Sequence, residues 1–359
     1  MSTEARAEGP TGGLPRVVGL DSIRFICALI VVFAHTGQPP ITTGIDTSTS
    51  LGWAVHALGG VLWSSAAAVI VFFVISGFCI HYPFARTNSI PSLLSYYPRR
   101  YVRIVVPVLA AIWLSSLVGL SLKLFNGSIL WSLAAELIYY TIYPVLLIAR
   151  RRLKSWLPLV GVAFVAALGV AASNLQAHDY PSFGLQLNWL LGLPCWLAGC
   201  QLADYIASRP PARPVPFIWV MRLGIWAGMS GCMILRYHSP LGYQWTLNVF
   251  ALLVAVWLAF EIRQSVFKPP SPKLEWLGTW SYSLYLTHKM AVIVYEKIGV
   301  PDLGYLLSWA VRLTFVLACA YLFYLVCERP AHILARIVAR MADRLVQSRT
   351  VPAHAKPPA

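Results

Sequence analysis

The feature that most constrains this chain is a succession of apolar segments, each close to the length that crosses a lipid bilayer. About 20 apolar residues in a helix span the hydrocarbon layer, and lipid leaves no partner for unpaired backbone groups. Pro, Gly, Asn or charged residues bound each segment, as expected for spans and loops. The sequence therefore predicts an all-α, polytopic membrane helix bundle of about ten transmembrane helices. We place the spans near 17–36, 57–82, 101–122, 129–148, 156–173, 185–206, 216–235, 243–260, 276–295 and 304–327.

The supply of water-facing side chains agrees with a membrane domain. Only 11% of the residues are charged and 58% are hydrophobic, whereas a soluble domain carries about 25% charged residues. We predict a transmembrane domain over residues 17–330, a disordered cytoplasmic tail at 1–16, and an amphipathic or disordered cytoplasmic tail at 331–359. No cleavable signal peptide is expected.

The positions of the basic residues predict the orientation in the membrane. The formal net charge is +15, but the Lys and Arg residues lie in short segments between apolar runs, which argues against a nucleic-acid partner. They concentrate after the even-numbered spans, which places both termini and these loops in the cytoplasm of an inner-membrane, multi-pass protein. The loop residues are Arg86, Arg99, Arg100, Arg103, Arg150, Arg151, Arg152, Lys154, Arg209, Arg213, Arg263, Lys268 and Lys273.

The tail at 331–347 has apolar residues at helical spacing and arginines on the other face. Two interpretations stay open: an amphipathic helix lying on the inner leaflet, or a simple extension of the last span. All seven cysteines fall inside predicted spans and form no CxxC pair, so neither a disulfide framework nor a metal site is expected.

Ionisable residues inside the spans are informative, because each is costly to hold in lipid. A helical rise of about 1.5 Å per residue places Glu136, His288 and Arg312 in the outer half of the membrane, with His35 near the same level. We predict that these four groups share a buried polar site. The ionisable residues are Arg24, His35, Glu136, His288, Lys289 and Arg312, and less securely His81, Asp204 and Arg222.

Arg24 and His35 lie on one face of the first predicted span. Eleven positions separate them, which makes three helical turns with about 20° left over and about 16 Å along the axis. One helix wall thus carries a permanent cation and a titratable base. Spacing alone leaves open that Arg24 snorkels to the inner surface and His35 is unrelated.

A second basic group stands at the start of the third span. Pro98 suits a helix start, and Arg99 and Arg100 each reach Arg103 at a spacing of four or three residues. Because guanidinium groups bind phosphates in a bidentate way, these arginines are a candidate site for a phosphorylated cofactor. Anchoring at the inner face is the alternative.

Several segments together resemble a known family. GLDSIRFICALIVVFAH resembles the first-helix signature of the acyltransferase 3 family of membrane proteins, in which an Arg precedes a His by eleven positions. The resemblance runs from about 17 to 332, without the soluble hydrolase-like domain that some members add. The remaining blocks follow in the family's order: FFVISGFCI (72–80), RRYVRIVVP (99–107), WSLAAELIYY (131–140), SYSLYLTH (281–288) and the closing Glu328-Arg329-Pro330.

The resemblance implies an O-acyltransferase. Such an enzyme moves an acyl group, most often acetyl from acetyl-coenzyme A, to a hydroxyl of a carbohydrate such as an exopolysaccharide, lipopolysaccharide or oligosaccharide. The family requires the first-helix Arg and His, which correspond to Arg24 and His35. Its arginine cluster corresponds to Arg100 and Arg103, with Arg99 adjacent, and the acidic residue of the WSL block to Glu136.

These residues suggest a mechanism. The phosphates of the donor, which is a substrate and not a permanently bound cofactor, would bind the arginine cluster, and its thin arm would enter the bundle past Arg24. Neutral His35 would act as general base toward the acceptor hydroxyl or would itself accept the acyl group. Glu136 would orient a base or counter a cation, and His288 would line the pocket. The partners would be membrane lipids and a carbohydrate or glycolipid acceptor.

The competing function is a proton-coupled transporter, in which the intramembrane His, Glu and Arg residues form a proton relay and substrate site. The sequence offers no inverted repeat and no pair of broken helices to support it. The cytoplasmic arginine cluster would also have no special role in a transporter.

Overall fold

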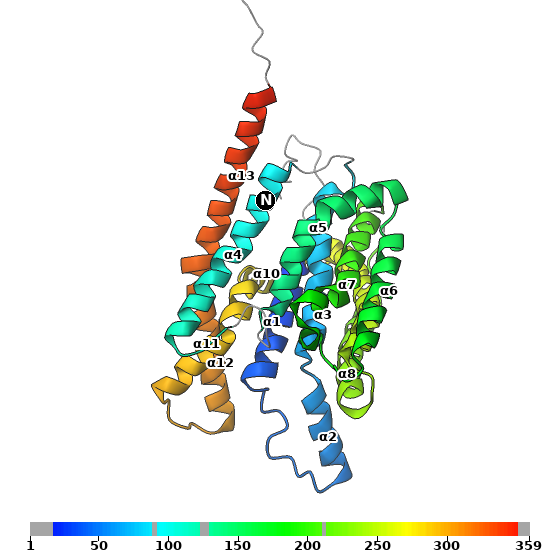
Figure 1. Cartoon of the computed structure of the whole chain (residues 1–359). Helices are drawn as coiled ribbons and strands as arrows, with labels where there is room; N and C mark the ends of the chain where they lie inside the picture. Colours follow the sequence, from blue (N-terminus) through cyan, green and yellow to red (C-terminus); the bar gives the residue numbers. More distant parts are fainter. Residues whose placement is uncertain (1–16, 88–91, 123–128, 210–212, 351–359) are drawn as a thin grey trace, which may run out of the picture.

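The computed structural model describes residues 17–87, 92–122, 129–209 and 213–350, with side chains to residue 344. The predicted tail at 1–16 and the end of the chain at 351–359 lie outside the described residues. All regular structure in the described part is helical (Figure 1). The elements are α1 Leu20–Thr36, α2 Ser50–Val61, α3 Ser65–His81, η1 Tyr82–Phe84, α4 Leu93–Leu117, α5 Trp131–Leu153, α6 Leu157–Ser173, η2 Tyr180–Phe183, α7 Gly184–Ser208, α8 Ile218–His238, α9 Tyr243–Phe267, α10 Pro272–Gly278, α11 Ser281–Ile298, α12 Tyr305–Phe323, η3 Tyr324–Glu328 and α13 Arg329–Thr350.

The prediction of a polytopic helical membrane protein is confirmed. Each predicted span contains one main helix (α1, α3 to α9, α11 and α12). Within the described residues, seven helical segments are long and apolar enough to cross a membrane, and α6 is a shorter apolar helix. The number of ten spans and the location of the termini stay predictions.

Two predicted spans are interrupted. The segment predicted at 57–82 is two helices, because the chain leaves the helix after Val61 and restarts at Ser65, where the Ser64 side chain accepts a hydrogen bond from the Ala67 N–H. Figure 1 shows α2 projecting from the end of the bundle. The segment at 276–295 also divides, into α10 and α11.

The most extensive helix contact among the described residues joins α3 and α7, where two glycines meet the facing backbone. A Cβ atom on Gly77 would overlap the carbonyl oxygen of Trp196, and one on Gly199 would overlap that of Val74. Small residues drive helix packing in membranes because they let backbones approach. The pair α3 and α7 is therefore fixed, and α5, α6 and α9 pack on α7 around it.

The basic loops meet at one end of the bundle. Arg86, Arg150 and Arg263, from three parts of the chain, all contact the last turns of α7. The Arg86 Nε, for example, donates to the carbonyl oxygen of Ala207 at 2.8 Å. We call this end of the bundle the basic end. Its assignment to the cytoplasm remains a prediction from the charge pattern.

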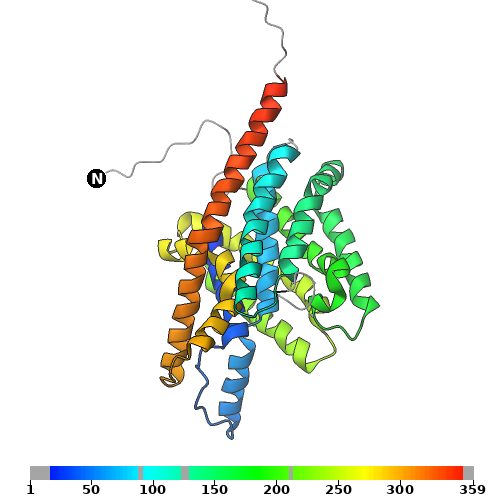
Figure 2. The ribbon, with the colours of Figure 1, turned by 60° about the vertical axis from the view of Figure 1, so that its left-hand side comes forward.

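The last span does not stop at the basic end. It continues through the π-helical turn Tyr324–Glu328 into α13, which packs along α4 and extends beyond the bundle (Figures 1 and 2). The tail is thus a helix that extends the last span. Its position relative to a lipid surface is still a prediction.

Candidate active site

The start of α1 is held by a side chain from a distant part of the sequence. Glu275 in α10 accepts hydrogen bonds from the backbone N–H groups of Gly19, at 3.2 Å, and Ser22, at 2.9 Å. It also accepts one from the Ser22 hydroxyl at 2.5 Å. These N–H groups have no partner within the helix, and a carboxylate there also complements the positive end of the helix dipole.

The other end of α1 is held from α12. The Arg312 Nη1 donates to the Thr36 carbonyl oxygen at 3.0 Å, and the Trp309 indole N–H donates to that of Gly37 at 3.2 Å. Because both ends are bonded, the axial position of α1 is defined. That position determines which cavities Arg24 and His35 can reach.

A first cavity of about 560 Å³ opens among α1, α3, α4, α5, α11 and α13. Arg24, Arg100, Arg103 and Glu136 all line it. The Arg24 guanidinium donates to the Asp21 carboxylate at 2.7 Å and to the Cys79 sulfur at 3.2 Å. The structure thus brings together the first-helix arginine, two arginines of the cluster and the predicted carboxylate.

Glu136 is part of a hydrogen-bond network on the wall of the first cavity. The Ser76 hydroxyl donates to it at 2.5 Å, and the Tyr140 hydroxyl donates to it as well. The Trp196 indole N–H donates in turn to the Ser76 oxygen at 3.3 Å. The Glu136 carboxylate faces α3 and therefore lies in the cavity of Arg24, not in that of His35. The depth of Glu136 in the membrane does not predict the direction of its side chain.

A second cavity of about 410 Å³ lies further along α1. His35 and Lys289 line it, together with tyrosines from η2 and α9. The His35 side chain is exposed to this space and makes no hydrogen bond to a described residue. Its ring stacks on that of His288, with centroids 5.5 Å apart and an angle of 24° between the planes. The predicted proximity of the two histidines is therefore present.

His288 is fully buried and lines neither cavity. Its Nδ1 lies 2.8 Å from the Tyr285 carbonyl oxygen. Because a carbonyl oxygen only accepts, Nδ1 carries the proton in the neutral ring, and Nε2 has the free lone pair. That Nε2 has no hydrogen-bond partner among the described residues.

The two cavities share a wall made by Val69 and Tyr285, which line both. The Tyr285 hydroxyl donates to the Ile129 carbonyl oxygen at 2.6 Å and accepts from the Ser132 hydroxyl at 2.9 Å. The phenol is thereby fixed across the boundary. Arg24 lies on one side of this wall and His35 on the other.

Two residues expected in these groups lie elsewhere. Arg99 does not line the first cavity, since its side chain is exposed and its Nη2 lies 4.0 Å from the Asp343 carboxylate of α13. Arg312 bonds the end of α1, as described above. The predicted single site is therefore two groups, one around Arg24 and one around His35.

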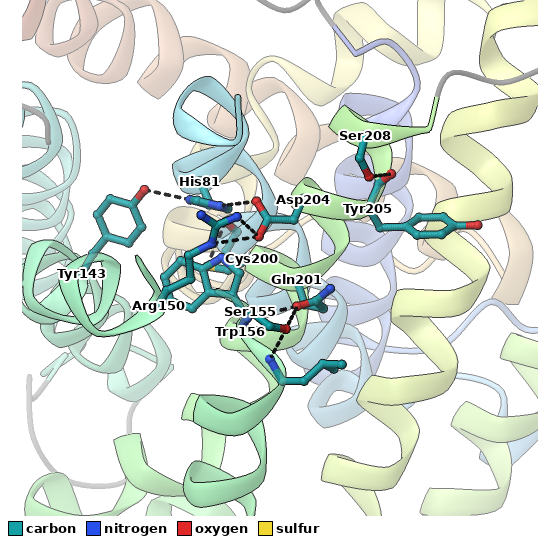
Figure 3. Close-up of polar contacts among 12 residues, drawn as sticks. His81, Tyr143, Arg150, Ser155, Trp156, Cys200, Gln201, Asp204, Tyr205 and Ser208 are labelled. Carbon is teal, nitrogen blue, oxygen red and sulfur yellow. Dashed lines mark hydrogen bonds and ion pairs between the residues drawn. The ribbon is translucent and has the colours of Figure 1, made fainter. Parts of the chain in front are cut away.

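The less secure candidates have local partners. Figure 3 shows His81 between Tyr143 and Asp204, with ring nitrogens at 3.0 and 2.8 Å from their oxygens. Arg150 completes the cluster with two bonds to Asp204, at 2.6 and 3.1 Å. Such pairing is what buried charges require, and we assign this cluster a structural role. Arg222 is likewise paired with Glu261, at 2.7 and 3.0 Å.

The described residues contain no group of three or more His, Cys, Asp or Glu side chains arranged to hold a metal ion. All seven cysteines are free. The side chains suited to a ligand are instead the guanidinium groups of the first cavity. The buried Nε of Arg100 has no hydrogen-bond partner in the part of the chain that the structure describes, and its guanidinium stacks over the Tyr96 ring at 5.8 Å. A phosphate would satisfy such a donor.

Comparison with known sequences identifies the family of this chain. The sequence profile of the acyltransferase 3 family, described as an acyltransferase domain, matches residues 17–325. The chain therefore belongs to this family and is a membrane acyltransferase. It is similar to the acyltransferase MdmB of Streptomyces mycarofaciens, at 24% identity over 357 residues, covering 86% of this chain and 88% of the relative. No solved structure matches significantly.

Proposed function

We propose that this acyltransferase moves an acyl group, most often acetyl, from acyl-coenzyme A in the first cavity to a carbohydrate hydroxyl in the second. One observation carries the proposal: Arg24 and His35 lie on one helix but line two different cavities, which meet at Val69 and Tyr285. A donor and an acceptor that enter from opposite ends would meet at this shared wall.

The first cavity suits the donor. Coenzyme A is a polyanion with a long thin arm that ends in the thioester. Arg100 and Arg103 would bind its phosphates near the basic end, and the arm would extend past Arg24 toward Tyr285. Glu136 offsets part of the positive charge in this cavity and, through Ser76, fixes the wall along which the arm passes.

The second cavity suits the acceptor and the base. Neutral His35 would take the proton of the acceptor hydroxyl while the hydroxyl oxygen attacks the thioester carbonyl carbon. The carbon–sulfur bond then breaks, and the proton passes from His35 to the departing thiolate. His288 packs on the His35 ring and restricts its orientation, so we assign it a positioning role.

A comparison of two variants tests the proposal. With purified protein, acetyl-coenzyme A and an acceptor glycan, free thiol should appear together with acylated glycan. His35→Ala should lower kcat by about 10²- to 10⁴-fold, the usual contribution of a general base, and should leave coenzyme A binding intact. Arg24→Gln should raise KM for the donor. Solute flux without thiol release would instead indicate a transporter, and near-normal transfer by His35→Ala would exclude His35 as the base.

A further inference from the structure

The C-terminal helix α13 forms one wall of the first cavity. His332 and Arg336 line this cavity together with Arg100 and Arg103 of α4. Both lie beyond residue 325, where the match to the family profile ends.

A row of alanines fixes how α13 lies on α4. Ala331, Ala335 and Ala339 recur every four residues and are 2%, 2% and 0% exposed. Side chains this small allow close helix contact, and Figure 2 shows the two helices side by side. His332 and Arg336 each follow one of these alanines. The contact that orients the helix thus directs both side chains to the cavity.

The charges at this place are not balanced. His332 lies close enough to Arg103 and Arg336 to interact electrostatically with both. The neighbouring carboxylate of Glu328 accepts two hydrogen bonds from Ser283, at 3.1 and 2.5 Å, and its other oxygen is 3.5 Å from His332. Within the described ranges, neither Arg103 nor Arg336 lies within ion-pair distance of a carboxylate, although Arg103 is near enough to Glu328 to interact with it electrostatically. Cations held together in this way favour an anionic ligand.

Anchoring at the membrane surface does not by itself explain Arg336. Arg336 and Arg340 are both exposed, but Arg340, one turn further along the same helix, lines neither cavity. Arg99, on α4, is likewise exposed and faces Asp343. Arg336 differs from both residues because it lines the cavity that holds the guanidinium groups of Arg24, Arg100 and Arg103.

We propose that Arg336 and His332 are donor-binding residues, which together with Arg100 and Arg103 hold the phosphates of acyl-coenzyme A between α4 and α13. The inference rests on the proposed use of a coenzyme A thioester. It assigns the C-terminal helix a part in substrate recognition in addition to any contact with lipid.

Calorimetric titration of coenzyme A into the full-length protein in neutral detergent tests the assignment. Arg336→Gln removes one charge-assisted contact to a phosphate and should therefore bind coenzyme A about tenfold more weakly than the wild type. Arg336→Lys should retain most of the affinity. The control Arg340→Gln should bind as the wild type does. In steady-state assays, Arg336→Gln should raise KM for acetyl-coenzyme A by the same factor and leave kcat unchanged. Unchanged elution on size exclusion and unchanged thermal unfolding would exclude misfolding.

Equal affinity of Arg336→Gln and Arg340→Gln would overturn the inference while leaving the proposed function intact. If Arg336→Gln instead loses only the thermal stabilisation given by phosphatidylglycerol vesicles, its ligand is a lipid headgroup and the inference is wrong. If the wild-type protein fails to bind coenzyme A, the donor named in the proposed function is incorrect, and the donor-binding role of Arg336 and His332 is then incorrect as well.

Discussion

Replacement of Glu275 should lower both stability and activity, although this residue lies outside both cavities. Its carboxylate accepts three hydrogen bonds at the start of α1, from the N–H groups of Gly19 and Ser22 and from the Ser22 hydroxyl. Loss of a helix cap costs about 0.5–2 kcal/mol. Loss of a negative charge at the positive end of a helix adds about 0.3–1 kcal/mol.

Glu275→Ala should therefore destabilise the start of α1 by about 1–3 kcal/mol. Because the end of α1 stays bonded to Arg312 and Trp309, we expect displacement rather than unfolding of the helix. Since small displacements of catalytic groups are costly, kcat/KM should fall about tenfold. Glu275→Gln keeps an acceptor oxygen but loses the charge, so its stability and its kcat/KM should lie between those of Glu275→Ala and the wild type.

Thermal unfolding in detergent and thiol release from acetyl-coenzyme A measure the two effects. Glu296→Ala is the matched control, because Glu296 is an exposed carboxylate on α11 that lines neither cavity. If Glu275→Ala and Glu296→Ala have the same melting temperature and activity, the cap does not position α1 and the reasoning is refuted.

Three further outcomes follow from the packing and the cavities. Gly77→Ala should destabilise the protein by about 1–3 kcal/mol through overpacking, measured by thermal unfolding, whereas Gly161→Ala, whose Cβ meets nothing within 4 Å, should not. Tyr285→Ala should open the shared wall to water and increase thiol release without acceptor; an unchanged rate would mean that Tyr285 does not separate the cavities. Cys79, which lines the first cavity, should react with a maleimide more slowly when acetyl-coenzyme A is present, as quantified by mass spectrometry of its peptide; equal labelling would place the donor elsewhere.

Hydropathy and charge pattern predicted the helical membrane architecture, because lipid permits few other solutions for a chain this apolar. The periodicity of one helix placed Arg24 and His35 on the same face. The structure adds that they line different cavities, whose walls come from other helices and turns that the periodicity of one helix does not place.

The other contacts of the two cavities join residues that are far apart in the sequence, so local sequence patterns do not predict them. Depth along a helix was available for Glu136, but the direction of its side chain was not, and the carboxylate faces Ser76. The cap on α1 joins Glu275 to Ser22, 253 positions apart. Arg99 looked equivalent to its neighbour Arg100 in sequence, yet rotation about α4 turns it away from the cavity.

We propose that the acyl group passes from the basic end of the bundle to the opposite end. Sealed inside-out vesicles containing the protein, loaded by freeze–thaw with surface glycan from a strain that lacks the gene, test it directly. Acetyl-labelled coenzyme A added outside should label the glycan inside, and vesicles with His35→Ala should not. When glycan is also added outside the vesicles, label on that glycan with none on the glycan in the lumen would contradict transfer across the membrane.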